Sequence, residues 1–266
     1  MSVSGENPEP APALLSVHAL TARFGGVVAL DKVDLKLRRG AISGLIGPNG
    51  AGKTTLFNCL SRLHTPESGE ILFEGRSLLR LAPHRIAEIG IGRTFQNVAL
   101  FPTLTVLENV MVGMHCRTKS DLLSNALRLP WAVKEERTAR ERARETIAFL
   151  GLEAVSNQIA TGLPFGTLKR VEMARALANE PTLLLLDEPA GGLNHEEVVN
   201  LIQILRKCRD QRGVSVLLVE HHMSLVMDVS DQVVVLNFGK KIADGTPVEV
   251  QRVPDVVRAY LGGSRA

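Results

Sequence analysis

One short stretch constrains the fold more than the rest of the sequence. Residues 47–54 match the phosphate-binding loop pattern G-x-x-x-x-G-K-[ST] at every position. The three glycines lack a Cβ, so the backbone can curve tightly and direct several N–H groups at one phosphate chain. Lys53 would add a positive charge at the β- and γ-phosphates, and the Thr54 hydroxyl is a ligand for Mg²⁺. We predict a site for ATP and Mg²⁺ formed by Gly47, Pro48, Asn49, Gly50, Ala51, Gly52, Lys53, Thr54 and Thr55.

The segments on either side of the loop have the character that such a loop requires. Residues 41–46 are mostly apolar and are expected to form a buried strand that runs into the loop. Residues 51–62 are expected to form the helix that follows. The N-terminus of this helix is itself an anion site, because its free N–H groups point toward the ligand. The context therefore supports the phosphate-loop interpretation.

Size, charge and cysteine content narrow the class of protein. A chain of 266 residues favours one large domain with a lobe over two independent domains. The net charge of +3 is too small to indicate a nucleic-acid partner, and we expect none. The three cysteines, at positions 59, 116 and 208, are scattered and odd in number, which favours neither a disulfide framework nor a zinc site. A reducing, cytoplasmic compartment fits this pattern.

The termini and the apolar stretches bear on targeting. Residues 1–13 are polar and rich in proline, so we expect a flexible tail there and a second short tail at 263–266. The longest uncharged stretch, residues 94–107, has 14 residues and contains Pro102, which is too short and too broken to span a bilayer. A location at a membrane would therefore depend on partners.

The first third of the chain is rich in strand patterns. Residues 14–22 and 32–37 alternate between apolar and polar side chains, which predicts strands with one solvated face. Residues 69–73 have the character of a further strand. From about residue 97 to residue 165 the pattern becomes helical, and 134–150 carries an apolar stripe on an otherwise charged helix. Within this helical lobe, we interpret residues 114–132 as an insertion or flexible excursion.

Strands and helices alternate again in the second half. Residues 168–179 are expected to form a helix, and 182–186 an apolar strand that is covered on both faces. Asn194 and Glu197 match a capping box that opens a helix ending at Gly213. We expect further buried strands at 214–219 and 232–236 and a C-terminal helix with its N-cap at Thr246. The pattern predicts a mainly parallel α/β core that a helical lobe interrupts.

The strand at 182–186 delivers two carboxylates, Asp187 and Glu188, at its C-terminal end. Ligands bind at this end of the strands in open α/β sheets. Asp187 is suitably placed to hold Mg²⁺, directly or through water, and Glu188 to orient and deprotonate an attacking water. Taken alone, the pair could equally be an exposed acidic strand end. The phosphate loop upstream favours the catalytic interpretation.

A second apolar strand runs into the adjacent histidines His221 and His222. Neighbouring residues on a strand point to opposite faces, so the two do not form a good zinc chelate. One of them is instead expected to reach the γ-phosphate. Gln96, which follows Arg93-Thr94-Phe95, indicates nothing by itself.

The order of these motifs resembles the nucleotide-binding subunit of ABC transporters over about residues 14–262. The motifs are the phosphate loop, RTFQ, LPFGTLKRVEMARAL, LLLLDEP, AGGLN and VEHH. Within that family, ALTARFGGVVAL, NVALFPTLTVLENV and PDVVRAYLG are similar to the ATP-binding subunit of branched-chain amino acid importers. The resemblance implies an α/β P-loop NTPase fold of the ABC type. Its expected parts are a mainly parallel sheet, N-terminal antiparallel strands and an inserted helical lobe at about 97–165.

The resemblance also implies a role for individual residues. Phe24 would stack on adenine, for which an aromatic face is a suitable platform. Glu188 would be the general base and His221 the switch residue, while Gln96 would sense Mg²⁺ and water. Residues 190–194 would cross a dimer interface. The implied metal ligands are Thr54, Gln96 and Asp187.

The partners follow from the resemblance as well. It implies two integral membrane permeases, one helix of which would meet the segment after Gln96. It also implies a second ATP-binding subunit, which we expect to be a different chain, with a second copy of this chain as the alternative. A substrate-binding protein would act indirectly. The subunit would lie at the cytoplasmic face of the inner (plasma) membrane.

One segment departs from the family pattern, since the signature LSGGQ appears here as LPFGT at residues 163–167. In the family this loop opens a helix and donates to the γ-phosphate held by the opposite subunit. Pro164 supplies neither the serine hydroxyl nor a backbone N–H. Gly166 is retained and Thr167 offers a shorter hydroxyl, so we expect both to contact the partner's ATP in trans. Either the loss of this donor slows hydrolysis at one of the two ATP sites between the subunits, or the Thr167 hydroxyl and the N–H groups at the helix N-terminus suffice to bind the γ-phosphate.

Three other functions share parts of this pattern. The ATPase of a lipid or lipopolysaccharide exporter has a similar subunit, and no residue separates it from an importer. A soluble ABC ATPase of DNA repair or translation would carry long coiled-coil insertions or two ATPase domains, and neither is found in this sequence. A regulatory subunit with little turnover is disfavoured by Glu188 and His221. We therefore expect an ATP-hydrolysing subunit of an amino acid importer.

Overall fold

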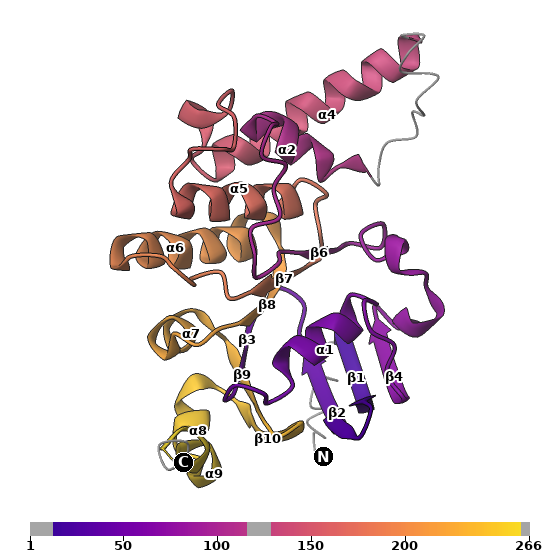
Figure 1. Ribbon diagram of the computed structural model, residues 1–266, viewed down its shortest axis with the longest axis vertical. Helices are drawn as coiled ribbons and strands as arrows, with labels where there is room; N and C mark the ends of the chain where they lie inside the picture. The colour runs from indigo at the N-terminus through magenta and orange to yellow at the C-terminus, as the bar shows by residue number, and fades with distance from the viewer. Residues whose placement is uncertain (1–12, 116–128, 262–266) are drawn as a thin grey trace, which may run out of the picture.

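The computed structural model describes residues 13–115 and 129–261, which form two sheets with helices packed around them (Figure 1). A four-stranded antiparallel sheet has the order β2-β1-β4-β5. The strands of this first sheet are β1 (Leu15–Phe24), β2 (Val27–Leu37), β4 (Ser68–Phe73) and β5 (Arg76–Ser77). Nearly all of the predicted tails, and most of the excursion predicted at 114–132, lie outside the described residues.

The second sheet has six strands in the order β10-β9-β3-β8-β7-β6. All of its neighbouring pairs are parallel except β9 and β10, which confirms the predicted mainly parallel core. Its three central apolar strands are buried along their whole length because both faces of the sheet are covered. The strands are β3 (Ile42–Ile46), β6 (Ile91–Arg93), β7 (Leu183–Asp187), β8 (Ser215–Val219), β9 (Gln232–Asn237) and β10 (Lys240–Gly245).

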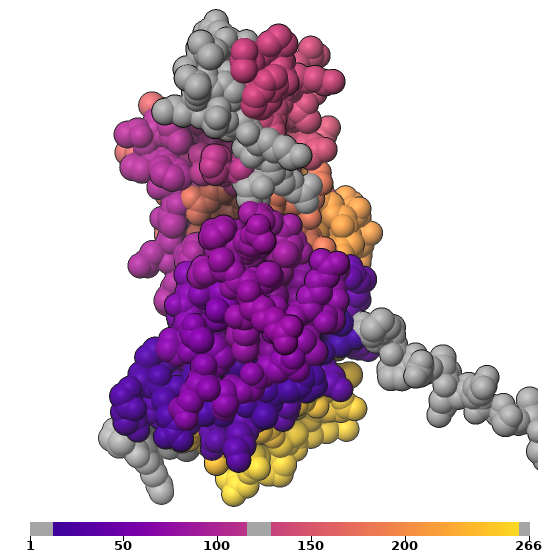
Figure 2. All heavy atoms as spheres, turned by 90° about the vertical axis from the view of Figure 1, so that its right-hand side faces the viewer, coloured from indigo at the N-terminus to yellow at the C-terminus, as the bar shows by residue number. Residues whose placement is uncertain are grey.

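Helices lie at both ends of the molecule as well as beside the six-stranded sheet (Figure 1). α2, α4 and α5 pack on one another at one end, and the C-terminal helices α8 and α9 lie at the other end in both views (Figures 1 and 2). α5 begins at residue 165, where the predicted helical lobe ends, and also packs on α2 and α4. The helices are α1 (Lys53–Leu60), α2 (Val106–Val112), α4 (Pro130–Phe149), α5 (Phe165–Leu177), α6 (His195–Arg212), α7 (Met223–Val229), α8 (Pro247–Gln251) and α9 (Pro254–Leu261).

Local sequence signals explain several helix ends. The Asn194 side chain accepts from the Glu197 N–H while the Glu197 carboxylate accepts from the Asn194 N–H, so the predicted capping box of α6 is confirmed. Thr246 and Glu249 form the same arrangement at α8. Gly213 ends α6 in the left-handed conformation, with φ 63°.

Several predicted boundaries are wrong, among them the start of β2, which begins at Val27 instead of residue 32. α1 begins at Lys53, two residues later than expected, because residues 51 and 52 still belong to the phosphate loop. α4 begins at Pro130, so residues 130–132 are helical; a proline is tolerated in the first turn of a helix. α5 begins at Phe165 instead of residue 168, directly after Pro164. The strands β5, β6 and β10 and the helices α2 and α7 were not predicted.

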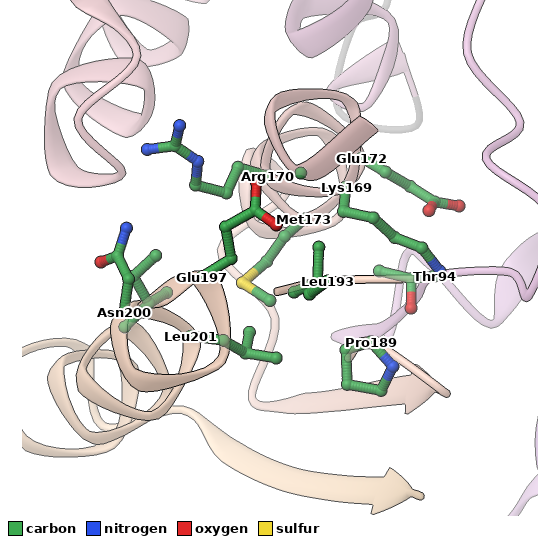
Figure 3. Close-up of a pocket in the computed structure, with 12 residues that line it drawn as sticks. Thr94, Lys169, Arg170, Glu172, Met173, Pro189, Leu193, Glu197, Asn200 and Leu201 are labelled. Atoms are coloured by element: carbon green, nitrogen blue, oxygen red, sulfur yellow. The ribbon is translucent and has the colours of Figure 1, made fainter. Parts of the chain in front are cut away.

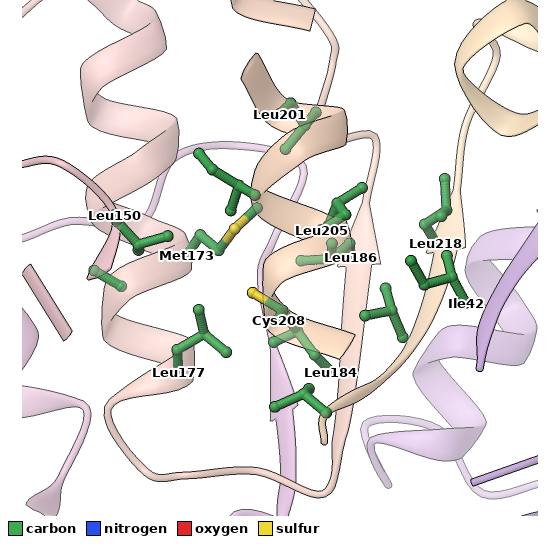
Figure 4. Packing of buried hydrophobic residues seen from close by; sticks show 14 of the residues in the cluster. Ile42, Leu150, Met173, Leu177, Leu184, Leu186, Leu201, Leu205, Cys208 and Leu218 are labelled. Carbon is green, nitrogen blue, oxygen red and sulfur yellow. The ribbon is translucent and has the colours of Figure 1, made fainter. Parts of the chain in front are cut away.

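The core consists of two apolar clusters, one on each face of the six-stranded sheet. Alternate residues of β7 divide between them, with Leu184 and Leu186 facing α5 and α6, and Leu183 and Leu185 facing α1 and the antiparallel sheet. On the first face, Leu205 of α6 lies near the labelled core residues of α5 and β7 (Figure 4). This period-2 division holds the parallel strands in one register.

Truncation of Leu205 tests the importance of the first cluster. Leu205 is fully buried, so Leu205→Ala leaves a cavity and should lower the free energy of unfolding by about 2–5 kcal/mol. Urea denaturation followed by circular dichroism measures the change. Lys207→Ala, at an exposed position of the same helix, should change it by no more than about 0.5 kcal/mol. Equal losses in both variants would contradict this packing.

Candidate functional site

The register of the parallel strands brings three loops to one edge of the sheet. Val219 at the end of β8 pairs with Leu45 of β3 on one side and with Asp187 of β7 on the other. The residues that follow each strand therefore emerge side by side. They are the phosphate loop, Glu188 and the Glu220–His221 pair, which are far apart in the sequence.

The phosphate loop has a backbone that requires glycine. Gly47 and Gly52 have φ of 152° and 102°. A Cβ at Gly47 would lie 2.1 Å from the Leu236 carbonyl oxygen, and a Cβ at Gly52 would lie 2.5 Å from that of Ala29. Both glycines therefore allow the loop to pack directly on neighbouring strands, and any side chain would displace it.

Lys53, the first residue of α1, is buried against this loop. Its Nζ donates to the carbonyl oxygens of Gly47 at 2.6 Å and Pro48 at 2.9 Å. Burial lowers the pKa of the Lys53 ammonium, while the nearby carboxylates of Glu188 and Asp187 act in the opposite direction. The side chain is thus held across the loop by groups that phosphate oxygens can replace.

The loop forms one wall of a cleft of about 530 Å³. Glu188 and His221 line the same cleft, so the structure places these two predicted catalytic residues beside the predicted phosphate site. Of the predicted loop residues, Gly47 and Pro48 do not line the cleft and contact Lys53 instead. The cleft is lined by Val27, Val28, Ala29, Asn49, Gly50, Ala51, Gly52, Lys53, Thr54, Thr55, Glu188, His221 and Phe238.

Glu188 is the centre of the polar contacts at this edge. Its Oε1 lies 2.6 Å from His221 Nε2, and its Oε2 accepts from Gln96 Nε2 at 3.0 Å. Glu188 also has φ 49°, a left-handed conformation that is unusual for a residue with a side chain. Such strain persists only where the surroundings hold it, here partly by the Glu188 N–H that donates to Val219 at 2.9 Å. Gln96, Glu188 and His221 are thus brought together.

Asp187, the residue before Glu188, is buried. Arg93 Nη2 donates to Asp187 Oδ2 at 3.3 Å, and the Arg93 guanidinium also lies over the rings of Phe57 and Phe95. Burial raises the pKa of Asp187, and the Arg93 charge opposes that shift. Arg93 belongs to the RTFQ motif, but its pairing with Asp187 had no signal in the sequence.

The predicted base-stacking residue lies outside the cleft. Phe24 is half-exposed, and its ring centroid is 4.4 Å from that of His64. Phe238, which was not predicted, lines the cleft and is 84% exposed, with φ 44° in the turn between β9 and β10. A lone phenylalanine next to a glycine carries no pattern that sequence reasoning could have used.

The departing signature segment is placed at the start of α5. Pro164 is the N-cap, and its carbonyl accepts from the Thr167 N–H at 2.9 Å. Gly166 contacts the beginning of α6 so closely that a Cβ would lie 2.1 Å from Glu197 Oε1. Neither Gly166 nor Thr167 lines the cleft of this subunit. The structure therefore does not bring them to the phosphate loop of the same chain.

Glu220 is a further residue at this edge that sequence reasoning missed. Its carboxylate is almost fully buried and accepts from the N–H groups of Ala190 at 2.6 Å and His221 at 3.0 Å. It joins the loop after β7 to the loop after β8. An acid at the end of an apolar strand, directly before the two histidines, was the available signal, since a carboxylate buried there needs nearby donors.

Comparison with known proteins gives consistent matches. A family model for the ABC transporter matches residues 30–191, and one for the branched-chain amino acid ATP-binding cassette transporter matches residues 240–266. The chain is 43% identical over 249 residues, 94% of this chain and 98% of the relative, to the high-affinity branched-chain amino acid transport ATP-binding protein LivG of Escherichia coli (strain K12). The same values hold for BraF of Pseudomonas aeruginosa.

Solved structures agree in fold. The ADP conformation of MJ1267, an ATP-binding cassette of an ABC transporter, superposes with a TM-score of 0.82 at 30% identity, over 95% of this chain and 100% of that chain. The dimeric structure of MJ0796, a bacterial ABC transporter cassette, gives a TM-score of 0.75 at 26% identity, over 88% and 98% of the two chains. The fold expected from the motifs is therefore shown.

Removal of the Lys53 charge tests the phosphate site. Lys53→Ala should weaken ATP binding by roughly 100-fold, because a hydrogen bond to a charged group contributes about 1.5–3 kcal/mol. Equilibrium binding of a fluorescent ATP analogue measures the change, and Lys207→Ala is the control at an exposed position. Unchanged affinity in Lys53→Ala would contradict the assignment.

Glu188→Gln tests the base. The amide can keep the contacts to Gln96 and His221 but cannot accept a proton from water at neutral pH. We expect hydrolysis to fall by roughly 100-fold or more while MgATP remains bound and a closed dimer accumulates. Phosphate release and size-exclusion chromatography with ATP report the two effects. Steady-state hydrolysis at the wild-type rate would exclude Glu188 as the base.

Proposed function

The chain belongs to the ABC transporter family of ATP-binding cassettes, and we propose that it is the ATPase subunit of an importer for branched-chain amino acids. The observation that carries the ATPase function is the Glu188 carboxylate, which lies between Gln96 and His221 at the cleft of the phosphate loop. The substrate class is supported by the relatives that are named for it and by the matching C-terminal segment at 240–266.

We propose that the phosphate loop binds ATP through its N–H groups, the N-terminus of α1 and the Lys53 ammonium. The oxygen atoms of Thr54, Gln96 and Asp187 suit a hard cation such as Mg²⁺, which would neutralise charge that develops on the phosphates. Asp187 is held by Arg93, so we place its carboxylate as the outer member of this set, acting through water. Phe24 and the exposed Phe238 are the two aromatic residues that we propose as candidates to stack on the adenine ring of ATP.

For hydrolysis, we infer that Glu188 accepts a proton from the attacking water while the bond between the γ-phosphorus and its bridging oxygen breaks. His221 and Gln96 each bind one oxygen of the Glu188 carboxylate, which restricts its rotation. Glu220 restrains the backbone of His221 in turn. The chain thus supplies a base whose direction is set before the substrate arrives.

We propose that two such subunits close around two ATP molecules, with Gly166 and Thr167 reaching the nucleotide of the opposite subunit. Their position at the start of α5, away from the chain's own cleft, supports a role in trans. No helix among residues 13–115 and 129–261 is long and apolar enough to cross a membrane. Since the relatives are named for transport, we assign membrane crossing to two permease subunits that this chain would meet at the cytoplasmic face, with a binding protein selecting the substrate.

Co-purification tests the assembly. The full chain, carrying an affinity tag, would be isolated from its native membranes with and without ATP, and the captured proteins identified by mass spectrometry. Two permeases and a second ATPase subunit would support the importer and the heterodimer. Uptake of labelled leucine into vesicles that contain the complex would then test the substrate. Capture of soluble partners alone would contradict the proposal.

Substitution of Pro164 tests the consequence of the altered signature. If the second ATPase subunit is a different chain, Pro164 directly faces only the site that holds the partner's ATP. Pro164→Ser restores a hydroxyl and a backbone N–H at the start of α5 and should raise turnover at that site by roughly 10-fold or more. ATPase assays of the assembled complex, with and without the substitution, measure the effect. Unchanged turnover would show that Thr167 and the helix amides suffice.

A further inference from the structure

Three charged side chains of α5 hold the short segment that carries Gln96. Lys169, Glu172 and Arg175 are spaced by three residues, so they follow one face of the helix. Lys169 Nζ donates to the Gln96 carbonyl oxygen at 3.3 Å, and Glu172 Oε1 accepts from the Phe95 N–H at 2.9 Å. Arg175 donates to the Ala99 carbonyl oxygen. Residues 95–99 are therefore fixed along their backbone by α5.

Lys169 also contacts the catalytic glutamate. Its Nζ donates to the backbone carbonyl oxygen of Glu188 at 3.3 Å, the same distance as to the Gln96 carbonyl. Only 9% of the residue is exposed, so its ammonium depends on these acceptors in place of water. One buried cation thus joins the two backbone positions from which the Gln96 and Glu188 side chains meet.

Glu172, on the same helix as Lys169, binds the residue before Gln96, because its carboxylate accepts from the Phe95 N–H. It is 1% exposed, and burial raises the pKa of its carboxyl group while the Phe95 N–H and the Lys169 charge oppose the shift. The side chains of Lys169 and Glu172 both extend from α5 toward the segment that carries Thr94 (Figure 3). Neither residue lines the cleft of the phosphate loop, so their effect on hydrolysis would be indirect.

The same helix begins with the altered signature at Phe165, Gly166 and Thr167. We propose that Lys169, supported by Glu172, is a positioning residue that sets the placement of Gln96 and Glu188 relative to α5. A shift of α5, when its N-terminus engages the partner's nucleotide, is then transmitted to the catalytic pair of its own subunit. This inference rests on the proposed roles of Gln96, Glu188 and the signature segment.

Lys169→Met tests the inference in the assembled complex. Methionine keeps the length and the packing of the side chain but donates no hydrogen bond. We expect kcat to fall by roughly 10- to 100-fold, because small displacements of catalytic groups have effects of this size. MgATP affinity should stay within about twofold of wild type, because Lys169 does not line the cleft. Amide hydrogen exchange of residues 95–99 should become faster.

Two variants serve as controls. Lys169→Arg restores a donor of similar reach and should recover most of kcat and of the exchange protection. Lys207→Met makes the same chemical change at an exposed position of α6 and should leave all three quantities unchanged. Glu188→Gln, measured in parallel, reports on the catalytic assignment independently of Lys169.

The possible outcomes distinguish the positioning role of Lys169 from the catalytic role of Glu188. Wild-type kcat in Lys169→Met, together with inactive Glu188→Gln, would overturn the positioning role and leave the base assigned. Hydrolysis by Glu188→Gln at the wild-type rate would overturn the base itself. A lower melting temperature in Lys169→Met, with kcat and MgATP affinity reduced in the same proportion, would show that Lys169 only stabilises the fold. A fall in kcat alone, with faster exchange at 95–99 and recovery in Lys169→Arg, supports the inference.

Discussion

The site depends on the register of the parallel strands in the six-stranded sheet. β3, β7 and β8 are apolar on both faces, and alternate side chains enter different clusters, so a slip by one residue would exchange the two faces. Because Leu45, Asp187 and Val219 are level with one another, the phosphate loop and the loops after β7 and β8 start at one edge. Hydrophobic burial therefore determines which polar groups meet, although none of those groups takes part in the apolar packing.

Buried charges then hold the loops that the sheet brings together. Glu220 binds the backbone of the loops after β7 and β8, and Lys169 binds those of Gln96 and Glu188. Such groups lose hydration on burial and are stable only with partners, so each one restrains the loops that satisfy it. The left-handed conformation of Glu188 is retained within these restraints. Polar contacts to the backbone thus position the loops at this edge of the sheet, and the apolar strands position the sheet from which these loops emerge.

Much of this arrangement could be predicted from local patterns. The glycine-rich loop, the apolar strands and the capping box at Asn194 carry their physical causes within a few neighbouring residues, so periodicity and motif spacing identify them. The contacts of Arg93, Glu220 and Lys169 join residues that are up to 94 positions apart, as between Arg93 and Asp187. No local pattern encodes such pairs. The exposed Phe238 likewise becomes meaningful only because its turn lies beside the phosphate loop.

The direction in which α5 faces has a consequence for a dimer of such subunits. Its N-terminus carries the signature residues, which do not line the chain's own cleft, while its next two turns bind the segment of Gln96 and the backbone of Glu188. A helix is stiff along its axis, since each turn is fixed by backbone hydrogen bonds. A displacement at one end therefore moves the other. If Pro164 weakens the binding of α5 to the partner's nucleotide, it also reduces the displacement of α5 that reaches Gln96 and Glu188 of its own subunit. The altered signature would therefore affect hydrolysis at both sites, although unequally.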